Sequence, residues 1–510
     1  MTALSAPPVG LAALVTTAGP RPTATITSPV DGRVLGEVPV CTPDDVALAV
    51  EAARAAQEAW AALPVGRRAG VLRRFASLLL AHETELLDLV QAEAGKARVQ
   101  AFVEFADVPL TAAYYARTAP GLLRPRRRRG AVPVLTRTVE HRRPVGVVGV
   151  ISPWNYPLTL AVSDALPALV AGNGVVLKPD SATPLTALLA ARLLAEAGLP
   201  DGLLGVVTGP GRELGPAMTD LVDYVMFTGS TATGRTIARR CAERLVGFSA
   251  ELGGKNPAVV LDDADLDRAV EGVVEACFAG AGQVCVSIER LYVTAGIHDA
   301  FVPALVDRVG RMRVGPGPGW DVEMGSLQSA EQLARVAAHV DDAVAKGARV
   351  LTGGHPLPHL GPFFYAPTLL ADVPDHAHLA REETFGPVVA VYRVADADEA
   401  VARANDSEYG LNASVWSRRA GPAVARRLRA GTVNVNEGYV AAWGSHDAPM
   451  GGMGASGVGR RHGAQGLLKY TEEQTVAHQR VLPAAPSWRL AGARYPAVIR
   501  PAVQVLRRLP

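Results

Sequence analysis

The sequence contains few cysteines and no long hydrophobic run. Its four cysteines, Cys41, Cys241, Cys277 and Cys285, form no CxxC pair and no zinc-like spacing, which argues against a disulfide framework and a structural metal site. No apolar run reaches the roughly 18 residues of a membrane-spanning helix. No Lys or Arg precedes the apolar stretch 9–16, as a secretory signal would require. We therefore expect a cytoplasmic protein that holds no metal and does not associate with membranes.

Composition and charge predict a globular α/β protein. The 51 basic and 49 acidic residues nearly cancel to a net charge of +2, so bulk electrostatics imply no nucleic-acid partner. Hydrophobic residues make up 49% of the 510-residue chain, which excludes disorder and provides for about three domains. The 51 glycines and 38 prolines show no collagen-like period and are typical of many strand-to-helix turns.

Short β-branched runs alternate with helical stretches from about residue 145. The runs 145–151, 175–177, 204–207 and 224–227 each end in turn residues, and 184–197 is one of the helical stretches between them. This alternation is typical of a parallel sheet with crossover helices. Ligands of such sheets bind beyond the carboxyl ends of the strands, so we expect the chemistry in the turns that follow them.

The remaining chain predicts a second unit, a basic run and a basic tail. A second alternating block spans 256–435. The arginine-rich run 124–129 is interpreted as a solvated or intersubunit surface. The tail 487–510 mixes arginines with apolar residues, as a membrane-surface helix does, but Pro496 and Pro501 are expected to interrupt it.

Three polar side chains in or near these turns each allow two interpretations. Cys285 is either a nucleophile or, like most lone cysteines and like Cys277, a small core residue. Glu251, beside two glycines, is either a general base or a helix-end carboxylate. Asn155, between two prolines, either satisfies the backbone or donates to a developing oxyanion.

Two glycine-rich turns are candidates for a phosphate site. The segment 452–457 is a literal GxGxxG, but it neither follows a strand nor opens a clear helix, so it is interpreted as a flexible turn. The turn 227–234 follows a strand and precedes a helix, where exposed amides and the helix dipole favour a pyrophosphate. On its own, this second turn is also consistent with an ordinary βα connection.

Taken together, these segments resemble the aldehyde dehydrogenase superfamily over nearly the whole chain, from about residue 22 to residue 475. The motifs, in the family's order, are PWNYP at 153–157, KP at 178–179, FTGS at 227–230 with Gly234, ELGGK at 251–255, GQVC at 282–285 and ETFGP at 383–387. The 34-residue gap from Glu251 to Cys285 is the one that the family shows. The likeness is greatest to the type that oxidises succinate semialdehyde with NADP.

The resemblance implies an α/β fold with a doubly wound parallel-sheet cofactor domain, an α/β catalytic domain and a β-arm. The implied ranges are 20–122 and 145–253 for the dinucleotide-binding domain, 254–461 for the catalytic domain, 123–144 and 462–480 for the oligomerisation arm, and 481–510 for a C-terminal tail. Because such an arm buries open sheet edges between subunits, a homodimer or a homotetramer is expected.

The activity implied by the resemblance is the NAD(P)-dependent oxidation of a small aldehyde to a carboxylic acid. Cys285 is implied as the nucleophile that forms a thiohemiacetal and then a thioester. Its oxyanion would be held by the Asn155 amide and the Cys285 backbone N–H, and Glu251 would activate the hydrolytic water. The presence of Glu251 argues against the branch of the family that transfers the acyl group to coenzyme A.

The resemblance also implies a nicotinamide cofactor. The implied contacts are Ser152, Trp154, Lys178, Ser181, Gly229, Ser230, Gly234, Leu252, Glu383 and Phe385. Members that prefer NAD carry Glu three positions beyond the motif lysine, where this chain has Ser181. A carboxylate would repel the 2′-phosphate of NADP, whereas a hydroxyl beside Lys178 can bind it. We therefore expect a preference for NADP over NAD.

Three positions depart from the family's pattern and leave the substrate and the bases open. Well-studied succinate-semialdehyde dehydrogenases bind the distal carboxylate with two arginines, where this chain has Ser163 and Ala279. The expected pocket walls are apolar: Tyr156, Val284, Val286 and Met450. An uncharged aliphatic or aromatic aldehyde is therefore the alternative substrate. At the third position, Arg461 stands where many members have a second carboxylate, which leaves Glu251 as the base that can be named.

Two other classes of function are weighed against this activity. A cofactor-independent cysteine esterase would use the same thiol and base, but no His has a recognisable partner motif. A non-catalytic protein on the same scaffold would be expected to have lost Cys285, Glu251 or Asn155, and all three are present.

Overall fold

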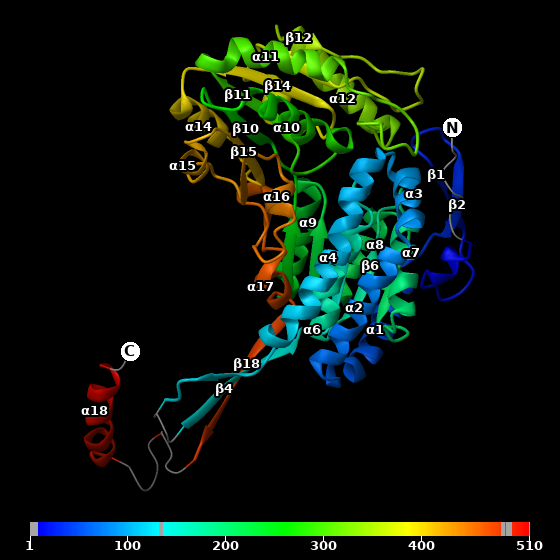
Figure 1. The fold of residues 1–510 in the computed structure, drawn as a ribbon. Helices are drawn as coiled ribbons and strands as arrows, with labels where there is room; N and C mark the ends of the chain where they lie inside the picture. The colour runs from blue at the N-terminus through cyan, green and yellow to red at the C-terminus, as the bar shows by residue number, and fades with distance from the viewer. Residues whose placement is uncertain (1–8, 132–135, 481–484, 486–491, 509–510) are drawn as a thin grey trace.

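The computed structural model describes residues 9–131, 136–480, 485 and 492–508. Figure 1 shows two α/β units, one above the other, and a long arm that projects from the lower unit. The lower unit is built on a six-stranded sheet and the upper unit on a seven-stranded sheet. The chain passes from the first sheet to the second between Glu251 and Asn256.

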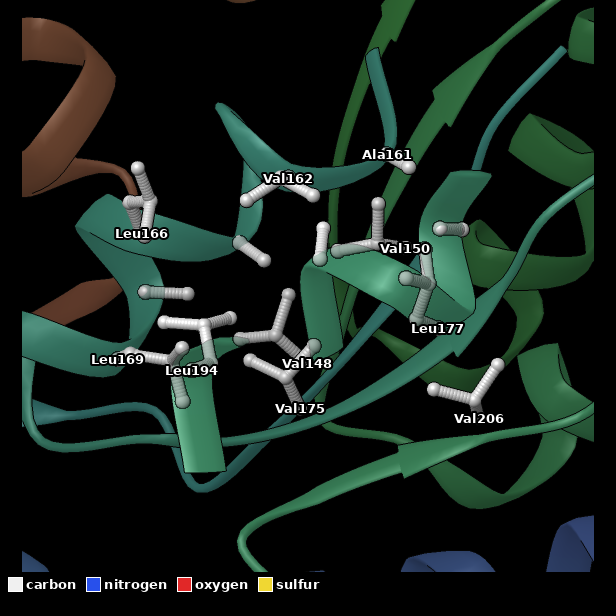
Figure 2. Packing of buried hydrophobic residues seen from close by; sticks show 14 of the residues in the cluster. Val148, Val150, Ala161, Val162, Leu166, Leu169, Val175, Leu177, Leu194 and Val206 are labelled. Atoms are coloured by element: carbon white, nitrogen blue, oxygen red, sulfur yellow. The ribbon is translucent and has the colours of Figure 1, made fainter. Parts of the chain in front are cut away.

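The first sheet has the strand order β17-β9-β8-β5-β6-β7 and is parallel except at the edge strand β17. The strands are β5 (Val147–Ile151), β6 (Gly174–Lys178), β7 (Leu204–Val206), β8 (Tyr224–Thr228), β9 (Gly247–Glu251) and β17 (Gly457–Val458). Every residue of β5, β6 and β8 is buried, as continuous apolar runs predict for a parallel sheet covered on both faces. Figure 2 shows Val148 and Val150 of β5 packed with Leu177 of β6 and with Leu166 and Leu169 of a covering helix.

Helices cover this sheet, as its crossover connections require. They are α1 (Pro43–Ala62), α2 (Val65–Ala81), α3 (Glu83–Ala94), α4 (Arg98–Leu122), α5 (Thr159–Val162), α6 (Ala165–Ala171), α7 (Pro184–Glu196), α8 (Gly211–Leu221) and α9 (Thr231–Arg244). α1 begins at a capping box formed by Thr42 and Asp45. A small antiparallel hairpin, β1 (Thr23–Thr27) with β2 (Val34–Pro39), precedes α1.

The second sheet has the strand order β12-β13-β14-β11-β10-β15-β16, and its edge strand β12 pairs antiparallel. Its strands are β10 (Asn256–Val260), β11 (Ile288–Thr294), β12 (Arg349–Thr352), β13 (Thr368–Ala371), β14 (Val388–Val394), β15 (Asn412–Trp416) and β16 (Thr432–Val435). Its helices are α10 (Leu266–Phe278), α11 (Ala295–Gly310), α12 (Ala330–Ala345), α13 (His378–Arg381), α14 (Ala397–Asn405), α15 (Gly421–Ala425) and α16 (Val440–Trp443). The two sheets confirm the predicted α/β fold with parallel-sheet units.

The arm consists of antiparallel strands β3 (Arg126–Arg128), β4 (Thr136–Pro144) and β18 (Thr471–Gln479). β18 is exposed along most of its length. Helix α17 (Gly463–Leu468) lies in the range assigned to the arm, but it packs on α4 and α6. This helix belongs to the first unit because its buried residues contact that core.

The GxGxxG segment lies at the edge of the first sheet. It forms a short 3₁₀ turn at Gly454–Ser456 and leads into β17, which pairs with β9. It therefore does not join a strand to a long helix, as the Rossmann fingerprint requires. β17 falls within the range assigned to the catalytic domain, so the predicted boundary at residue 461 differs from the sheet pairing.

The described residues of the C-terminal tail include the helix α18 (Arg494–Leu506), so the expectation that prolines interrupt it is wrong. Pro496 lies in the first turn, where a helix needs no N–H donor, and Pro501 is accommodated inside the helix. Within the described ranges, none of the helices combines the length and the apolar character that crossing a bilayer demands.

Candidate active site

A cavity of about 200 Å³ lies beyond the carboxyl ends of β5, β8 and β9. Ligands of parallel α/β sheets bind at this position. Residues singled out from the sequence that line the cavity are Trp154, Asn155, Gly229, Ser230, Glu251, Leu252, Cys285, Glu383 and Phe385. Ser152, Lys178, Ser181 and Gly234 do not belong to this lining.

Cys285 lies in the loop that joins α10 to β11. The loop turns at Gly282, where φ is +70° and a Cβ would lie 2.1 Å from the Gly386 carbonyl oxygen, so the turn requires glycine. Asn256 Nδ2 donates a 2.8 Å hydrogen bond to the Cys285 carbonyl. All four cysteines are described, and Cys285 is the one that is partly exposed, whereas Cys277 lies in the core.

The Asn155 side chain is held against the loop of Cys285. Its Nδ2 donates a 2.8 Å hydrogen bond to the carbonyl of Gln283, two residues before the cysteine. Gln283 is itself anchored, because its Oε1 accepts the Gln328 N–H at 2.9 Å. The Asn155 amide carries a second N–H, which this bond does not use.

Glu251 is the last residue of β9 and is 3% exposed. Burial raises the pKa of its carboxyl to about 7, and the positive charge of Arg461 opposes that rise. In the described part of the chain, its Oε2 has no hydrogen-bond partner. A carboxyl that titrates near neutral pH and has an unused acceptor atom is suited to take a proton.

The surroundings of Cys285 raise the pKa of its thiol. Burial raises the pKa of the thiol to about 12; the positive charge of Arg461 acts against the rise, and the carboxylates of Glu251 and Glu383 add to it. Because the thiolate is the nucleophilic form, Cys285 needs a base beside it, and Glu251 lines the same cavity.

Glu383 and two aromatic rings form the opposite side of the cavity. Glu383 Oε1 accepts the Gly254 N–H at 2.7 Å, and a Cβ at Gly253 would lie 2.6 Å from its Oε2. The two glycines therefore make room for this carboxylate. The rings of Trp154 and Phe385 meet edge to face, with their centroids 5.5 Å apart.

The start of α9 has the features of a dinucleotide site. Ser230 caps the helix, and its side chain accepts the Thr233 N–H at 3.3 Å. A Cβ at Gly234 would lie 2.4 Å from Leu252, so glycine allows α9 to approach this segment closely. Ser152 Oγ is buried and finds no hydrogen-bond partner among the residues described, so a bound polar group would satisfy it. These residues fit a nicotinamide dinucleotide, with its phosphates at the helix N-terminus.

Lys178 and Ser181 lie together beyond β6, beside the turn that precedes α8. Lys178 is 3% exposed, its Nζ donates a 2.7 Å hydrogen bond to the Pro179 carbonyl, and burial lowers its pKa. Ser181 Oγ donates at 2.8 Å to the Gly209 carbonyl. A Cβ at Gly211 would lie 3.6 Å from Lys178 Cε, so this turn also faces the lysine.

Comparison with known proteins places this site in a family. The model of the aldehyde dehydrogenase family matches residues 16–476. The chain belongs to the aldehyde dehydrogenase family.

A Mycolicibacterium smegmatis protein named "Putative succinate-semialdehyde dehydrogenase, NADP(+)" is 53% identical, over 94% of this chain and 93% of its own. The NADP(+) succinate-semialdehyde dehydrogenase of Escherichia coli is 38% identical, over 88% of this chain and 92% of its own. The crystal structure of betaine aldehyde dehydrogenase from Staphylococcus aureus with NAD+ has a TM-score of 0.86 and 33% identity, covering 91% of this chain and 94% of its own.

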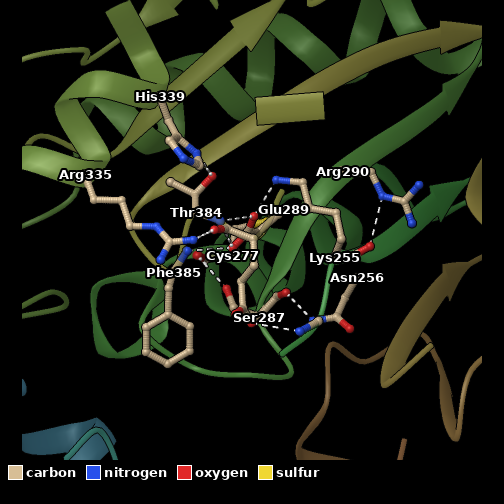
Figure 3. Close-up of polar contacts among 12 residues, drawn as sticks. Lys255, Asn256, Cys277, Ser287, Glu289, Arg290, Arg335, His339, Thr384 and Phe385 are labelled. Carbon is tan, nitrogen blue, oxygen red and sulfur yellow. Dashed lines mark hydrogen bonds and ion pairs between the residues drawn. The ribbon is translucent and has the colours of Figure 1, made fainter. Parts of the chain in front are cut away.

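A buried polar network beneath the cavity of this aldehyde dehydrogenase was not predicted from the sequence (Figure 3). Lys255 forms an ion pair with Glu289 of β11, and both side chains are buried. Glu289 also accepts the backbone N–H groups of Thr384 and Phe385, each at 2.9 Å. The pair therefore fixes the turn that begins at Glu383. The sequence signal that could have predicted this network was a charged residue in the apolar run of β11, because a buried charge needs a partner.

Replacing Lys255 by methionine is expected to destabilise this aldehyde dehydrogenase by about 3–5 kcal/mol, because Glu289 would stay buried without its partner. Urea unfolding of the variant and the wild type measures the difference. Lys346→Met is the matched control, since Lys346 pairs with Asp342 at the surface and its loss is expected to cost less than about 1 kcal/mol. Equal stabilities of the Lys255 variant and the wild type would contradict this role of the pair.

The four predicted walls of the aldehyde pocket gather around Cys285. Tyr156, Val284, Val286 and Met450 belong to one buried apolar cluster, against which the cysteine packs. Trp443 is in the same cluster, and its ring lies 6.2 Å from that of Tyr156.

The two positions at which arginine would bind a distal carboxylate carry no positive charge. Ser163 Oγ donates a 2.9 Å hydrogen bond to Asp107, and Ala279 is a buried residue of the loop before the cysteine. Asp107 also pairs with His446 at 3.1 Å. The first of these positions therefore carries a neutral hydroxyl that is bonded to a carboxylate.

Proposed function

We propose that this aldehyde dehydrogenase oxidises succinate semialdehyde to succinate and prefers NADP. The observation that carries the chemistry is that Cys285, Asn155 and Glu251 come from three separate segments and face one cavity. The proposed substrate and cofactor follow the names of the relatives from M. smegmatis and E. coli. Ser181, which presents a hydroxyl and no carboxylate beside Lys178, supports the preference for NADP.

In the proposed mechanism, Glu251 takes the thiol proton and the sulfur of Cys285 forms a bond to the aldehyde carbon. The resulting oxyanion accepts hydrogen bonds from the Asn155 amide and from the Cys285 backbone N–H. The cofactor, when bound, supplies the acceptor for the hydride that leaves this carbon, and a thioester to Cys285 remains. After the thiol proton has passed from Glu251 to solvent, the ionised carboxylate takes a proton from water and the water oxygen bonds to the acyl carbon. The C–S bond then breaks, which releases the acid and the Cys285 thiolate.

The residues that would hold the cofactor form one group at each of its ends and a third group between them. Glu383 and Phe385 would hold the nicotinamide ribose next to the cysteine, and Lys178 and Ser181 would hold the adenosine ribose and its 2′-phosphate. Between these groups, Ser152, Trp154, Gly229, Ser230, Gly234 and Leu252 would follow the diphosphate and the nicotinamide.

Replacing Ser181 by glutamate is expected to lower kcat/KM for NADP by about tenfold or more, because the new carboxylate would face the 2′-phosphate. The value for NAD is expected to change less, so the NADP/NAD ratio falls. Ser181→Ala is the control, since it removes the hydrogen bond to Gly209 without adding a charge. A ratio that stays constant in the glutamate variant would contradict the placement of the 2′-phosphate.

The substrate is tested by following absorbance at 340 nm with NADP and then with NAD. Succinate semialdehyde, octanal and benzaldehyde are compared on the purified protein. We expect the largest kcat/KM for succinate semialdehyde. The second candidate is an uncharged aldehyde, which is favoured by the apolar cluster around Cys285 and by the neutral side chains of Ser163 and Ala279. A larger kcat/KM for octanal or benzaldehyde would establish this second candidate instead.

We also propose that the arm joins subunits into a homodimer or a homotetramer. β18 runs along the arm for nine residues with most of them exposed, which leaves a strand edge that another subunit would cover. The four free cysteines support a reducing, cytoplasmic location.

A further inference from the structure

One buried cation lies behind the cavity and has no part in the mechanism so far. Arg461 is 6% exposed, and its Nη2 is 2.7 Å from Oδ2 of Asp164. The same Nη2 donates to Thr228 Oγ1 at 3.2 Å, and the guanidinium lies over the Trp443 ring, 5.7 Å from its centroid. Its Nε finds no partner in the described ranges.

The backbone on both sides of Arg461 places it next to Glu251. Thr228 of β8 is the direct register partner of Glu251 in β9. The backbone N–H and carbonyl of Arg461 form two 2.8 Å hydrogen bonds with Met450. The residue after Met450 is Gly451, where a Cβ would lie 2.8 Å from Glu251 Oε1. These contacts therefore place Arg461 beside Glu251, the proposed general base.

Arg461 is a cation that faces both reacting side chains. The charges that face Glu251 are Arg461, Lys469, Asp164 and Arg460. The charges that face Cys285 are Arg461, Glu251 and Glu383. Arg461 lowers the pKa of both groups, whereas Asp164 raises the pKa of Glu251. The charges that face Arg461 itself are Asp164, Glu251, Cys285 and Asp107.

We propose that Arg461, oriented by Asp164, is a positioning residue that supplies the positive charge of the catalytic pocket. Its charge stabilises the anionic forms that Cys285 and Glu251 adopt during the reaction, and the bond to Asp164 holds the guanidinium behind these groups instead of in the path of the aldehyde. This inference rests on the proposed function, because it assigns those two roles to Cys285 and Glu251.

Alkylation of Cys285 by iodoacetamide tests this proposal on the full chain without aldehyde or cofactor. Arg461→Met is expected to slow alkylation about tenfold or more at a fixed pH near 8, because a smaller fraction of the thiol is ionised. Arg461→Lys keeps the charge and is expected to restore most of the rate. An alkylation rate in Arg461→Met equal to that of the wild type would overturn the proposal.

The pH profile of aldehyde oxidation supplies a test that a merely structural role would not pass. Removing the cation in Arg461→Met is expected to raise the midpoint of the limb that depends on Glu251. Removing the anion in Asp164→Asn is expected to lower the same midpoint, so the two variants should shift in opposite directions. Shifts in the same direction, or no shift in either variant, would overturn the proposal.

The double variant Arg461→Met with Asp164→Asn keeps the proposal testable if a lone buried charge unfolds either single variant, because both charges leave together. It is expected to fold and to alkylate as slowly as Arg461→Met, whereas wild-type alkylation in this variant would overturn the proposal. The proposed function fails separately, through a wild-type enzyme that does not oxidise aldehydes while its Cys285 still alkylates.

Discussion

Replacing Cys285 by alanine is expected to lower kcat for aldehyde oxidation by at least about 10⁴-fold, because no other thiol belongs to the described lining of the cavity. Binding of the cofactor should remain, since Glu383 and the start of α9 are unchanged. Formation of NADPH at 340 nm with purified variant and wild type measures the effect. A variant that keeps more than a few per cent of the activity would exclude Cys285 as the nucleophile.

Cys277→Ala is the matched control for this experiment. Cys277 lies eight residues earlier, is buried in the core and belongs to α10. Its loss is expected to leave kcat close to that of the wild type.

The same pair of variants tests the cysteine esterase as the alternative activity. Hydrolysis of p-nitrophenyl acetate by the wild type, without any reduction of NADP or NAD in the presence of aldehydes, would favour the esterase.

Replacing Glu251 by glutamine is expected to lower steady-state oxidation by about 10²–10⁴-fold, because the amide cannot accept the proton of the hydrolytic water. The first turnover of NADPH formation should slow as well, because Glu251 also takes the thiol proton. Stopped-flow absorbance measures this first turnover, and intact mass spectrometry measures the acyl group that stays on Cys285.

The rate of hydrolysis is expected to depend on pH, and the pKa of Glu251 gives the direction of this dependence. Burial raises the pKa of Glu251 to about 7, and the carboxyl is active as a base only when it is ionised. Hydrolysis in the wild type should therefore rise with pH through about 7, and this limb should be absent in the glutamine variant. Glu213→Gln, a change at an exposed residue of α8, is the control and should keep the wild-type profile. A slow variant that retains the limb would assign the base to another group.

The sequence determined the architecture of the first unit because its signals are local. Runs such as 145–151 and 224–227 are continuous and apolar, and strands of that kind must be covered by helices on both faces. Glu251 ends β9, so its place at the carboxyl edge of the first sheet followed from the parallel topology. Cys285 precedes β11 of the second sheet, and only the tertiary structure brings it to the same cavity.

Local signals were insufficient where a contact joins distant segments. The sequence showed Lys255 and Glu289 separately, but only the tertiary structure decided that they pair beneath the turn of Glu383. The tail shows the opposite error, because a rule about proline predicted an interruption at Pro501 where α18 continues.

Arg461 shows most clearly what each level decided. From the sequence it was a departure from the family's pattern, an arginine where many members have a carboxylate. The structure pairs it with Asp164, 297 positions away, and places its charge behind Glu251. Electrostatic energy depends on distance in space and on burial, and neither quantity is set by residue type or spacing along the chain. The sequence by itself therefore singled out the groups that are proposed to react, and the tertiary structure decided which charges surround them.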